Sequence, residues 1–439
     1  MPFSCSVRAR APRLAGKTAL TALLALASVG PLQGCVVINR LSGTDTVDLS
    51  RATLRRMTVS LRKEEQSVCP REQVQLGAFR TAVPEGGKEE KTYETWFGRG
   101  NVNKNDKLEF TNFMFQSDQG QIDKDGWFAP LQSLAATAGH EFIVHATYVP
   151  SPTVYTYTYK WKPDYTCITS ASAAGTLGAP GGRGKDGKPG RFGDGGGVMS
   201  SGGDGQDGAP GDVGAVGAIG GAGPKIHAVV TYVKTPFYDK LVAVRLTGAI
   251  NDLLLVHPGR PFAIHAIGGV GGPGGPGGNG GRGGDGSAGN PGGRGGSGGA
   301  GGFGGRGGKG GAGGAVDIVC DSRFPDLIPL VGIDSPGGEG GPGGTPGKAG
   351  APGAGGKGIV PVNTPTDPHD GARGHDPNDG GAGPPGARGD DGTFVAHLGS
   401  IGDAFANLSD ITVLSSAAAA AAVVAPAPPP APLPRHGAH

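Results

Sequence analysis

The sequence predicts a mainly β protein, in which an N-terminal β-sandwich is followed by a bundle of six glycine-rich, polyproline II-type helices capped by short β-strands. Two observations lead to this prediction. The 439 residues include 89 Gly and 37 Pro, more than twice the ordinary share of about 12%. The aromatic side chains that build a core lie elsewhere, since residues 50–174 hold 16 of the 26 Phe, Trp and Tyr. One large globular enzyme is therefore excluded, and a conventional core is expected only in the first part.

The chain begins with the features of a signal peptide. An apolar run, TALTALLALASV, covers residues 18–29. This run has the length of a signal-peptide core and is too short to span a bilayer, which takes about 20 residues. We therefore expect residues 1–34 to be removed after export. Four basic side chains precede the run, those of Arg8, Arg10, Arg13 and Lys17.

The end of this segment, Leu32-Gln-Gly-Cys35, resembles the lipobox of bacterial lipoproteins. The resemblance implies that Cys35 is acylated and becomes the mature N-terminus, ahead of a linker over residues 35–46. Val36 stands where an Asp holds many such lipoproteins in the inner membrane, so the family rule implies the outer membrane or the cell surface. An N-terminus with two or three acyl chains anchors stably. The alternative is an ordinary cleavage site with Cys35 as an incidental residue.

The formal net charge of +2 gives no argument for nucleic-acid binding. Removal of the four basic residues of the signal peptide leaves a mature chain with a charge of about −2. The predicted partners are therefore the membrane, which is reached through the lipid, and an unidentified surface ligand or envelope component, with no nucleic acid among them.

Export also constrains the cysteines, because exported proteins reach an oxidising compartment. Cys5 is removed with the signal peptide and Cys35 is acylated, which leaves three. Cys69 and Cys167 lie near the two ends of the aromatic-rich region, so we expect them to form a disulfide. Cys320, in the apolar run AVDIVC, is expected to remain a buried thiol. No zinc-ligand spacing is present, and no metal or other cofactor is predicted.

Residues 47–171 are predicted to form the β-sandwich. Apolar and polar residues alternate in six short runs separated by clusters of Gly, Pro, Asn and Asp, as in half-buried strands. The spacing resembles that of immunoglobulin-like bacterial surface domains, although the Trp and Cys pattern of antibody domains is absent. The six expected strands cover residues 54–61, 74–79, 93–97, 108–115, 142–149 and 154–161.

Two apparent metal motifs in this region are rejected. The sequence His140-Glu-Phe-Ile-Val-His145 resembles a zinc-protease motif, but three residues instead of two separate the Glu from the second His. On an alternating strand the two imidazoles would also point to opposite faces. The sequence Asp123-Lys-Asp-Gly126 is predicted to form a turn rather than a calcium loop, because the remaining ligands and the closing Glu do not follow.

Three later regions repeat glycine at every third residue, and each is interrupted near its middle. A period of three fits the polyproline II helix, which has no internal hydrogen bonds, so each run needs neighbouring runs to satisfy its backbone. The similar lengths predict three antiparallel hairpins, with each run about 70 Å long. The six runs cover residues 175–196, 202–223, 268–286, 292–313, 337–358 and 371–392.

Within residues 172–414, two kinds of side chain are expected to separate. In the middle region two of every three residues are usually Gly, so the third would face outward; such residues include Arg282, Asp285, Arg294, Arg306 and Lys309. The apolar interludes between the hairpins should gather as a sheet that caps one end of the bundle. These interludes cover residues 226–233, 240–247, 253–257, 261–267, 315–320, 328–334, 393–398 and 411–414.

This pattern resembles the polyglycine II sandwich proteins, such as the glycine-rich receptor-binding adhesins of some tailed phages and the snow-flea antifreeze protein. The resemblance covers about half of the chain. In the phage proteins the loops at the bundle tip bind the receptor, which corresponds here by position to residues 197–201, 287–291 and 359–370. The alternative is a collagen-like trimeric stalk, since stretches such as GPPGARGDDG fit that repeat too. Gly in the second position through most of the middle region removes the rigidity that a triple helix uses.

We expect a monomeric, non-enzymatic, lipid-anchored module of the cell envelope with a structural or adhesive role. The alternatives are the trimeric stalk and a carbohydrate-processing enzyme in the sandwich, for which the sequence offers no paired carboxylates or nucleophile motif.

The Ala- and Pro-rich residues 415–439 are predicted to be a disordered tail. Five apolar residues at the predicted tip are expected either to contact a ligand or to close the bundle by packing on one another: Val198, Met199, Ile359, Val360 and Val362.

Overall fold

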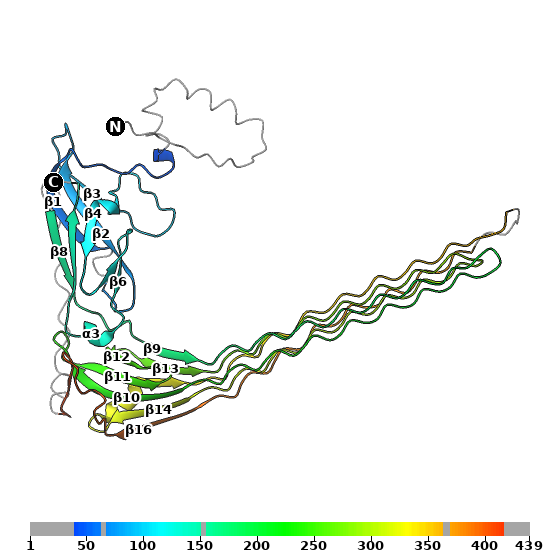
Figure 1. Ribbon diagram of the computed structural model, residues 1–439. Helices are drawn as coiled ribbons and strands as arrows, with labels where there is room; N and C mark the ends of the chain where they lie inside the picture. Colours follow the sequence, from blue (N-terminus) through cyan, green and yellow to red (C-terminus); the bar gives the residue numbers. More distant parts are fainter. Residues whose placement is uncertain (1–38, 63–66, 151–154, 363–368, 417–439) are drawn as a thin grey trace. The chain divides into compact units, whose positions relative to one another are not determined.

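The computed structural model describes residues 39–62, 67–150, 155–362 and 369–416 (Figure 1). The predicted signal peptide, the predicted lipidation site at Cys35 and the tail beyond residue 416 lie outside the described residues. The described chain is mainly β and divides into two compact units. Unit 1 comprises Met1–Leu131 and Glu141–Pro163; unit 2 comprises Gln132–His140 and Asp164–His439.

Unit 1 contains two antiparallel sheets. The first has the order β1-β2-β6-β5, with β3 also paired to β2, and the second has the order β4-β7-β8. Every described strand pair in the unit is antiparallel. The strands are β1 (Thr53–Leu61), β2 (Val74–Val83), β3 (Lys91–Glu94), β4 (Phe113–Gln116), β5 (Gly120–Ile122), β6 (Trp127–Pro130), β7 (Phe142–Tyr148) and β8 (Tyr155–Trp161), with a 3₁₀ turn η1 at Phe110–Asn112 before β4.

A single hydrophobic core combines residues from both sheets of unit 1, an arrangement consistent with a β-sandwich. Period-two alternation buries Phe142, Val144 and Ala146 of β7, and Leu76 and Ala78 of β2 are equally buried. Four of the six predicted strands agree with β1, β2, β7 and β8 to within a few residues. The other two agree only in part, because β3 ends at Glu94 and residues 110–112 of the predicted strand 108–115 form the turn η1. The hairpin β5–β6 was not predicted, because its strands have only three and four residues.

The predicted turn at Asp123–Gly126 is confirmed as the connection of this hairpin. The carboxylate of Asp123 accepts hydrogen bonds at 2.9 Å from the N–H groups of Asp125 and Trp127. Gly126 has a φ of +77°, which a residue with a side chain adopts at a cost. The Asp carboxylate therefore caps a turn, as such residues commonly do.

Unit 1 also buries a charge that the sequence did not reveal. Arg80 of β2 is fully buried, and its guanidinium lies 3.8 Å from the ring centroid of Tyr155 and 5.3 Å from that of Tyr148. Burial lowers the pKa of Arg80. The two aromatic faces partly replace the water that the cation loses.

Unit 2 contains two more sheets, which the prediction had treated as one. The larger has the order β12-β11-β10-β14-β16, with β17 paired to β10, and the smaller has the order β15-β13-β9. The predicted apolar interludes correspond to strands, except that residues 328–330 belong to the 3₁₀ turn η2. No strand was predicted at β9, whose residues lie on both sides of the predicted domain boundary between residues 171 and 172. The elements are α3 (Leu134–Thr137), β9 (Ser170–Ala174), β10 (Lys225–Lys234), β11 (Leu241–Gly248), β12 (Asp252–Val256), β13 (Phe262–Ile267), β14 (Ala315–Asp321), η2 (Pro325–Leu330), β15 (Val331–Asp334), β16 (Thr393–Gly399) and β17 (Thr412–Val413).

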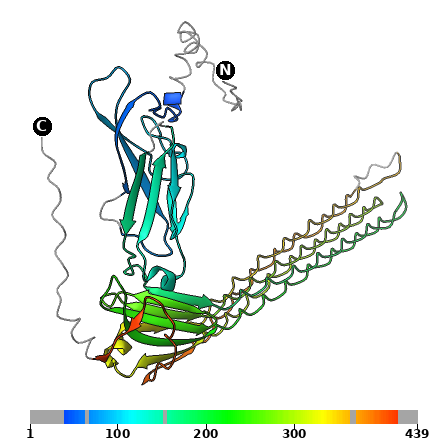
Figure 2. The same ribbon diagram turned by 60° about the vertical axis from the view of Figure 1, so that its left-hand side comes forward.

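The six glycine-rich runs extend from these sheets, and Figures 1 and 2 show them side by side. We call them S1 to S6, in chain order. Within each hairpin the two segments are antiparallel, as predicted: the N–H of Ala218 in S2 donates to the carbonyl of Ala179 in S1, and the N–H of Gly221 donates to Thr176. Equivalent ladders with N···O distances of mostly 2.7 to 2.9 Å join S3 to S4 and S5 to S6.

Successive hairpins are also joined. The second segment of one hairpin and the first of the next are antiparallel, as when the N–H of Gly272 in S3 donates to Ala218 in S2, whereas corresponding segments of successive hairpins are parallel. The N–H of Gly178 in S1 donates to Val270 in S3, and that of Gly274 in S3 donates to Pro342 in S5. The same pattern runs from S2 to S4 and from S4 to S6. The segments therefore form two layers, S1-S3-S5 and S2-S4-S6. Each layer continues into one sheet of the base, because β9, β13 and β15 precede the first set and β10, β14 and β16 follow the second.

The number of neighbouring segments explains why S3 and S4 have Gly at two of every three positions. S3 bonds to S1, S2, S4 and S5, and S4 likewise has four neighbours, whereas S1 and S6 have two each. At Gly281 of S3, an added Cβ would overlap the backbone carbonyl of Lys188. A central segment therefore needs Gly at two of every three positions, and an outer segment at only one.

Proline follows the same geometry. Except for Pro377, each Pro of the six segments lies at a position of the three-residue repeat that does not donate to a backbone carbonyl of a neighbouring segment. Because Pro has no N–H, it removes no bond there and fixes φ for the extended conformation. Pro377 replaces a donor in S6. The nearby bonds from Gly298 to His375 and from Gly374 to Gly353 lengthen to 3.2 and 3.1 Å.

We predict that Gly281→Ala destabilises unit 2, because the methyl group would displace the carbonyl of Lys188 and separate S3 from its neighbours. The expected cost is about 1 to 3 kcal/mol, as for other overpacking substitutions. Thermal unfolding followed by circular dichroism measures it. Gly182→Ala in S1 is the matched control, since nothing lies within 4 Å of its added Cβ; equal melting of the two variants would contradict the packing argument.

Candidate contact surface on the glycine-rich segments

The three interruptions of the glycine period lie together at the end of the segments away from the sheets, as predicted (Figure 1). The N–H of Asn290 donates to the carbonyl of Ser200 at 2.8 Å, and its side-chain amide donates to Val198 at 3.3 Å. The N–H of Ile359 donates to Gly289 at 2.8 Å. Backbone bonds thus connect all three loops into one surface, which we call the tip.

The five predicted tip residues fall into two groups. Met199 and Val362 are each 92% exposed, and Val198 is also exposed, whereas Ile359 and Val360 are half-buried. The tip therefore combines an exposed apolar surface with a partly packed base. Residues 363–368 of the longest loop lie outside the described residues.

An ion pair closes this longest loop. Lys357 donates to Asp370 at 2.8 Å, and the other carboxylate oxygen of Asp370 accepts the N–H of Gly358 at 2.9 Å. These hydrogen bonds lower the pKa of Asp370 and raise that of Lys357. The ion pair thus holds the two ends of the loop together, at the point where S5 ends and S6 begins.

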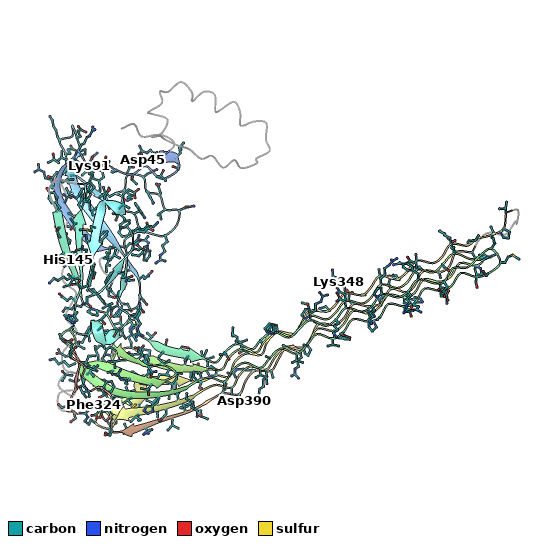
Figure 3. The ribbon with its side chains drawn as sticks, viewed as in Figure 1. Asp45, Lys91, His145, Phe324, Lys348 and Asp390 are labelled. Carbon is teal, nitrogen blue, oxygen red and sulfur yellow. The ribbon has the colours of Figure 1, made fainter. Side chains whose placement is uncertain are left out.

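The outward positions of the segments carry their charges, as Figure 3 shows for Lys348 and Asp390. The predicted outward residues are exposed, except that Asp285 is half-buried because its carboxylate accepts the N–H of Ala354 in the adjacent segment at 2.8 Å. Asp186 and Asp204 accept N–H groups of neighbouring segments in the same way, both at 2.7 Å. These carboxylates satisfy donors that the carbonyl ladders leave free.

The outward surface also holds an apolar stripe that sequence reasoning missed. Val213, Val216 and Ile219 of S2 lie on one face at a spacing of three residues, and all are more than half exposed. Phe303 of S4 is 61% exposed and lies against Gly381 of S6, where an added Cβ would come within 2.7 Å of its ring. The available signal was the pattern GDVGAVGAIG, in which an apolar residue precedes each Gly.

A groove of about 400 Å³ crosses the larger sheet where S2, S4 and S6 end and its strands begin. One register row across β11, β10, β14 and β16 contributes Thr247, His227, Asp317 and Val395 to it. Asp317 pairs with His227 at 2.9 Å, and His397 lies 3.7 Å from its other oxygen. These groups are about half exposed, and sequence reasoning did not identify them.

The rejected zinc-protease motif is not a site. His145 projects from β7 to solvent and bonds through Nδ1 to the hydroxyl of Thr158 at 2.9 Å. His140 precedes β7 instead of lying on a strand, so our argument from strand alternation was wrong for that residue. Among the described residues no group of three or more His, Cys, Asp or Glu is arranged to hold a metal ion.

The cysteine predictions can be compared with the structure at three positions. Cys69 and Cys167 are disulfide-bonded, which confirms the predicted pair. Cys320 of β14 is a free, fully buried thiol, also as predicted. Burial raises the pKa of Cys320 to about 11.

No protein-family model, curated protein or solved structure matches the chain. Within the part of the chain that the structure describes, no helix is long and apolar enough to cross a membrane.

We predict that Cys320 does not react with iodoacetamide in the native protein at pH 8. At a pKa of about 11, only about one thiol in a thousand is ionised at that pH, and the thiolate is the nucleophile. Mass spectrometry of a non-reduced digest should find Cys320 unmodified and Cys69 bonded to Cys167. Unfolding in guanidinium should make Cys320 reactive; a Cys320 that is alkylated as fast in the native state would contradict its burial.

Proposed function

We propose that this protein is a non-enzymatic, lipid-anchored module of the outer membrane or cell surface that presents S1 to S6 as a rigid polyglycine II bundle with a structural or adhesive role. The observation that carries the proposal is the ladder of backbone hydrogen bonds between neighbouring segments of one chain. Such a ladder resists bending without a hydrophobic core, since the bonds recur at every third residue along the segments. Side chains are then needed only on the outer faces and at the tip.

The polyglycine II assignment is supported by the three-residue period, by the absence of intrasegment bonds in the ladder and by the close approach of backbones at Gly. For the collagen-like alternative, the same repeats would have to pair between three chains. Here the segments of one chain supply ladder partners to one another on up to four sides, so a bundle needs no second chain. An immunoglobulin-like topology for unit 1 belongs to the proposal as well, supported by its two antiparallel sheets.

A structural or adhesive role fits the chemistry of the outward side chains better than catalysis does. Four ion pairs among the described residues of the segments join residues three apart, such as Arg282 with Asp285 at 2.7 Å and Arg388 with Asp391 at 2.7 Å. Exposed pairs of this kind contribute only about 0 to 1 kcal/mol each. The tip and the apolar stripe are the other outward surfaces, and their exposed apolar side chains are available to contact a ligand.

Lipid anchoring is tested by metabolic labelling with palmitate in a bacterial host. We expect labelled protein from the unmodified gene and none from Cys35→Ala, because the lipid is proposed to bond to that sulfur. Cys320→Ala is the control, since this buried thiol lies far along the chain and should leave the label unchanged. Equal labelling of the unmodified protein and Cys35→Ala would rule out the anchor.

Adhesion through the tip is tested with the double substitution Met199→Ser and Val362→Ser, on cells that display the protein and are washed over alkyl-coated glass. Both side chains are almost fully exposed, so we expect at least a tenfold loss of retained cells with an unchanged melting temperature. Leu177→Ser of S1 is the matched control on the side of the bundle, because Leu177 is 77% exposed and lies outside the apolar stripe. If cell retention stays unchanged, or falls only together with thermal stability, the tip residues close the bundle by packing on one another and do not mediate adhesion.

A further inference from the structure

The larger sheet of unit 2 ends at an open strand. On one side of the segments, β10 is followed by β11 and β12, but within the described residues β16 is the last strand on the other side. Phe394 is 61% exposed, Val395 58% and Leu398 42%. These three residues point alternately to both faces, so β16 is uncovered above and below as well as along its edge.

The parallel register fixes which backbone groups of β16 are free. Thr393 pairs with Ala315, the N–H of Thr393 donates to Gly314, and the N–H of Ser322 donates to the carbonyl of Gly399. In a parallel ladder only every second residue bonds to a given neighbour. The odd-numbered residues therefore bond to β14, and the N–H and C=O groups of Phe394, Ala396 and Leu398 point to the open edge.

The side chains of these same residues lie on the face that the buried side chains of β14 occupy, but they are themselves exposed. Phe394, Ala396 and Leu398 are in register with Val316, Ile318 and Cys320 of β14, all of which are buried. Natural edge strands are commonly protected by Lys, Pro, an inward charge or a bulge. The sequence of β16, TFVAHLG, contains no Lys, Arg, Asp, Glu or Pro, and its pairing with β14 is continuous.

We propose that a second copy of this chain pairs with β16 in antiparallel fashion, so that the larger sheets of two molecules become one. The free groups set the register: Ala396 lies opposite Ala396 of the second copy, and Phe394 lies opposite its Leu398. Each of these pairs exchanges two hydrogen bonds, which gives six across the edge. A second copy is the occupant that the strand itself favours, because this register pairs apolar with apolar side chains and brings no like charges together.

This proposal revises the sequence-based expectation of a monomer while keeping one chain in each bundle. Because β16 follows S6 directly, antiparallel pairing directs the two bundles away from the shared sheet in opposite directions. The proposal is independent of the lipid anchor and of adhesion at the tip.

The first test is a disulfide at the twofold axis in the full-length protein, purified in mild detergent with Cys320→Ala as background. Paired residues of this kind have Cα atoms about 5.5 Å apart, within the range that a disulfide bridges. We expect Ala396→Cys to give a two-chain band under mild oxidation on non-reducing gels. Val395→Cys is the matched control on the same exposed strand, because its diagonal distance to its own copy, about 7 to 8 Å, is too long.

The second test is the mass of the same full-length protein by light scattering. We expect two chains, and a fall of the dimer fraction to below about a tenth for Phe394→Lys, since a charge at an edge opposes pairing. Phe303→Lys on the side of the bundle is the control, with the same 61% exposure; it should remain a dimer. Equal melting temperatures of the two variants would show that Phe394→Lys acts on association and not on folding.

Three outcomes would overturn the proposal. A one-chain mass for the unmodified protein, without a two-chain band for Ala396→Cys, would mean that the edge is not a self-association site. A one-chain mass that becomes two chains when residues 417–439 are deleted would mean that the chain's own tail covers β16. A three-chain mass would favour the collagen-like alternative instead.

Discussion

The structure of unit 2 depends on the absence of side chains between adjacent backbones. Where two segments meet, the N–H of one and the carbonyl of the next are within 2.7 to 3.2 Å, and an added Cβ would occupy the same space. Each such bond contributes only about 1 kcal/mol net, whereas ordering a residue costs about 1 to 2 kcal/mol, and Gly more than most. A single hairpin therefore cannot be stable by itself. The ladders stabilise the segments only as a set, in which the central ones bond on four sides.

The two sheets at the base supply what the ladders lack, which is a hydrophobic core and a fixed register. Because β9, β13 and β15 lead into one layer and β10, β14 and β16 continue the other, each segment starts or ends on a strand already held beside its neighbour. The parallel pairing of strands such as β10 and β14 repeats the parallel pairing of S2 and S4 that runs into them. The burial of Ile226, Ala228 and Val316 thus stabilises the start of the ladders as well as the sheet.

The sequence predicts those parts of this arrangement that are encoded by residues close together in the chain, and it does not predict pairing between distant segments. Gly at every third residue, with similar run lengths, predicts hairpins, and the antiparallel pairing within each hairpin was predicted correctly. The parallel pairing between hairpins was not, although it was encoded in the doubled Gly of S3 and S4, which marks segments with four neighbours. The alternation that predicted β10 to β16 says nothing about which strands share a sheet, so two sheets were taken as one.

The candidate surfaces were predicted less completely, because exposure is a property of the assembled layers. Met199 and Val362 stood out as apolar residues in a break of the repeat, whereas Val213 and Ile219 lie inside it at a position that became recognisable as outward only once the neighbours were known. Arg80 and the pair of Asp317 with His227 depend on contacts between distant parts of the chain, and no local spacing encodes them.

The same layer geometry explains why one strand is left open. A bundle built from hairpins in two layers has an outermost segment in each, and S6 is the last of its layer, with only S4 and S5 as neighbours. In the segments this edge is tolerated, because only one backbone N–H in three donates to a carbonyl of a neighbouring segment. The other positions can hold Pro, which has no N–H, or can donate to an Asp side chain. A β-strand has no such tolerance, because half of its backbone groups point to each side. The transition from S6 to β16 at residue 393 therefore converts a tolerated edge into one with unpaired donors, unpaired acceptors and an uncovered Phe394. On the opposite side β11 and β12 remove that problem within the chain, so the asymmetry of the sheet, and not any single residue, makes β16 the place for a partner.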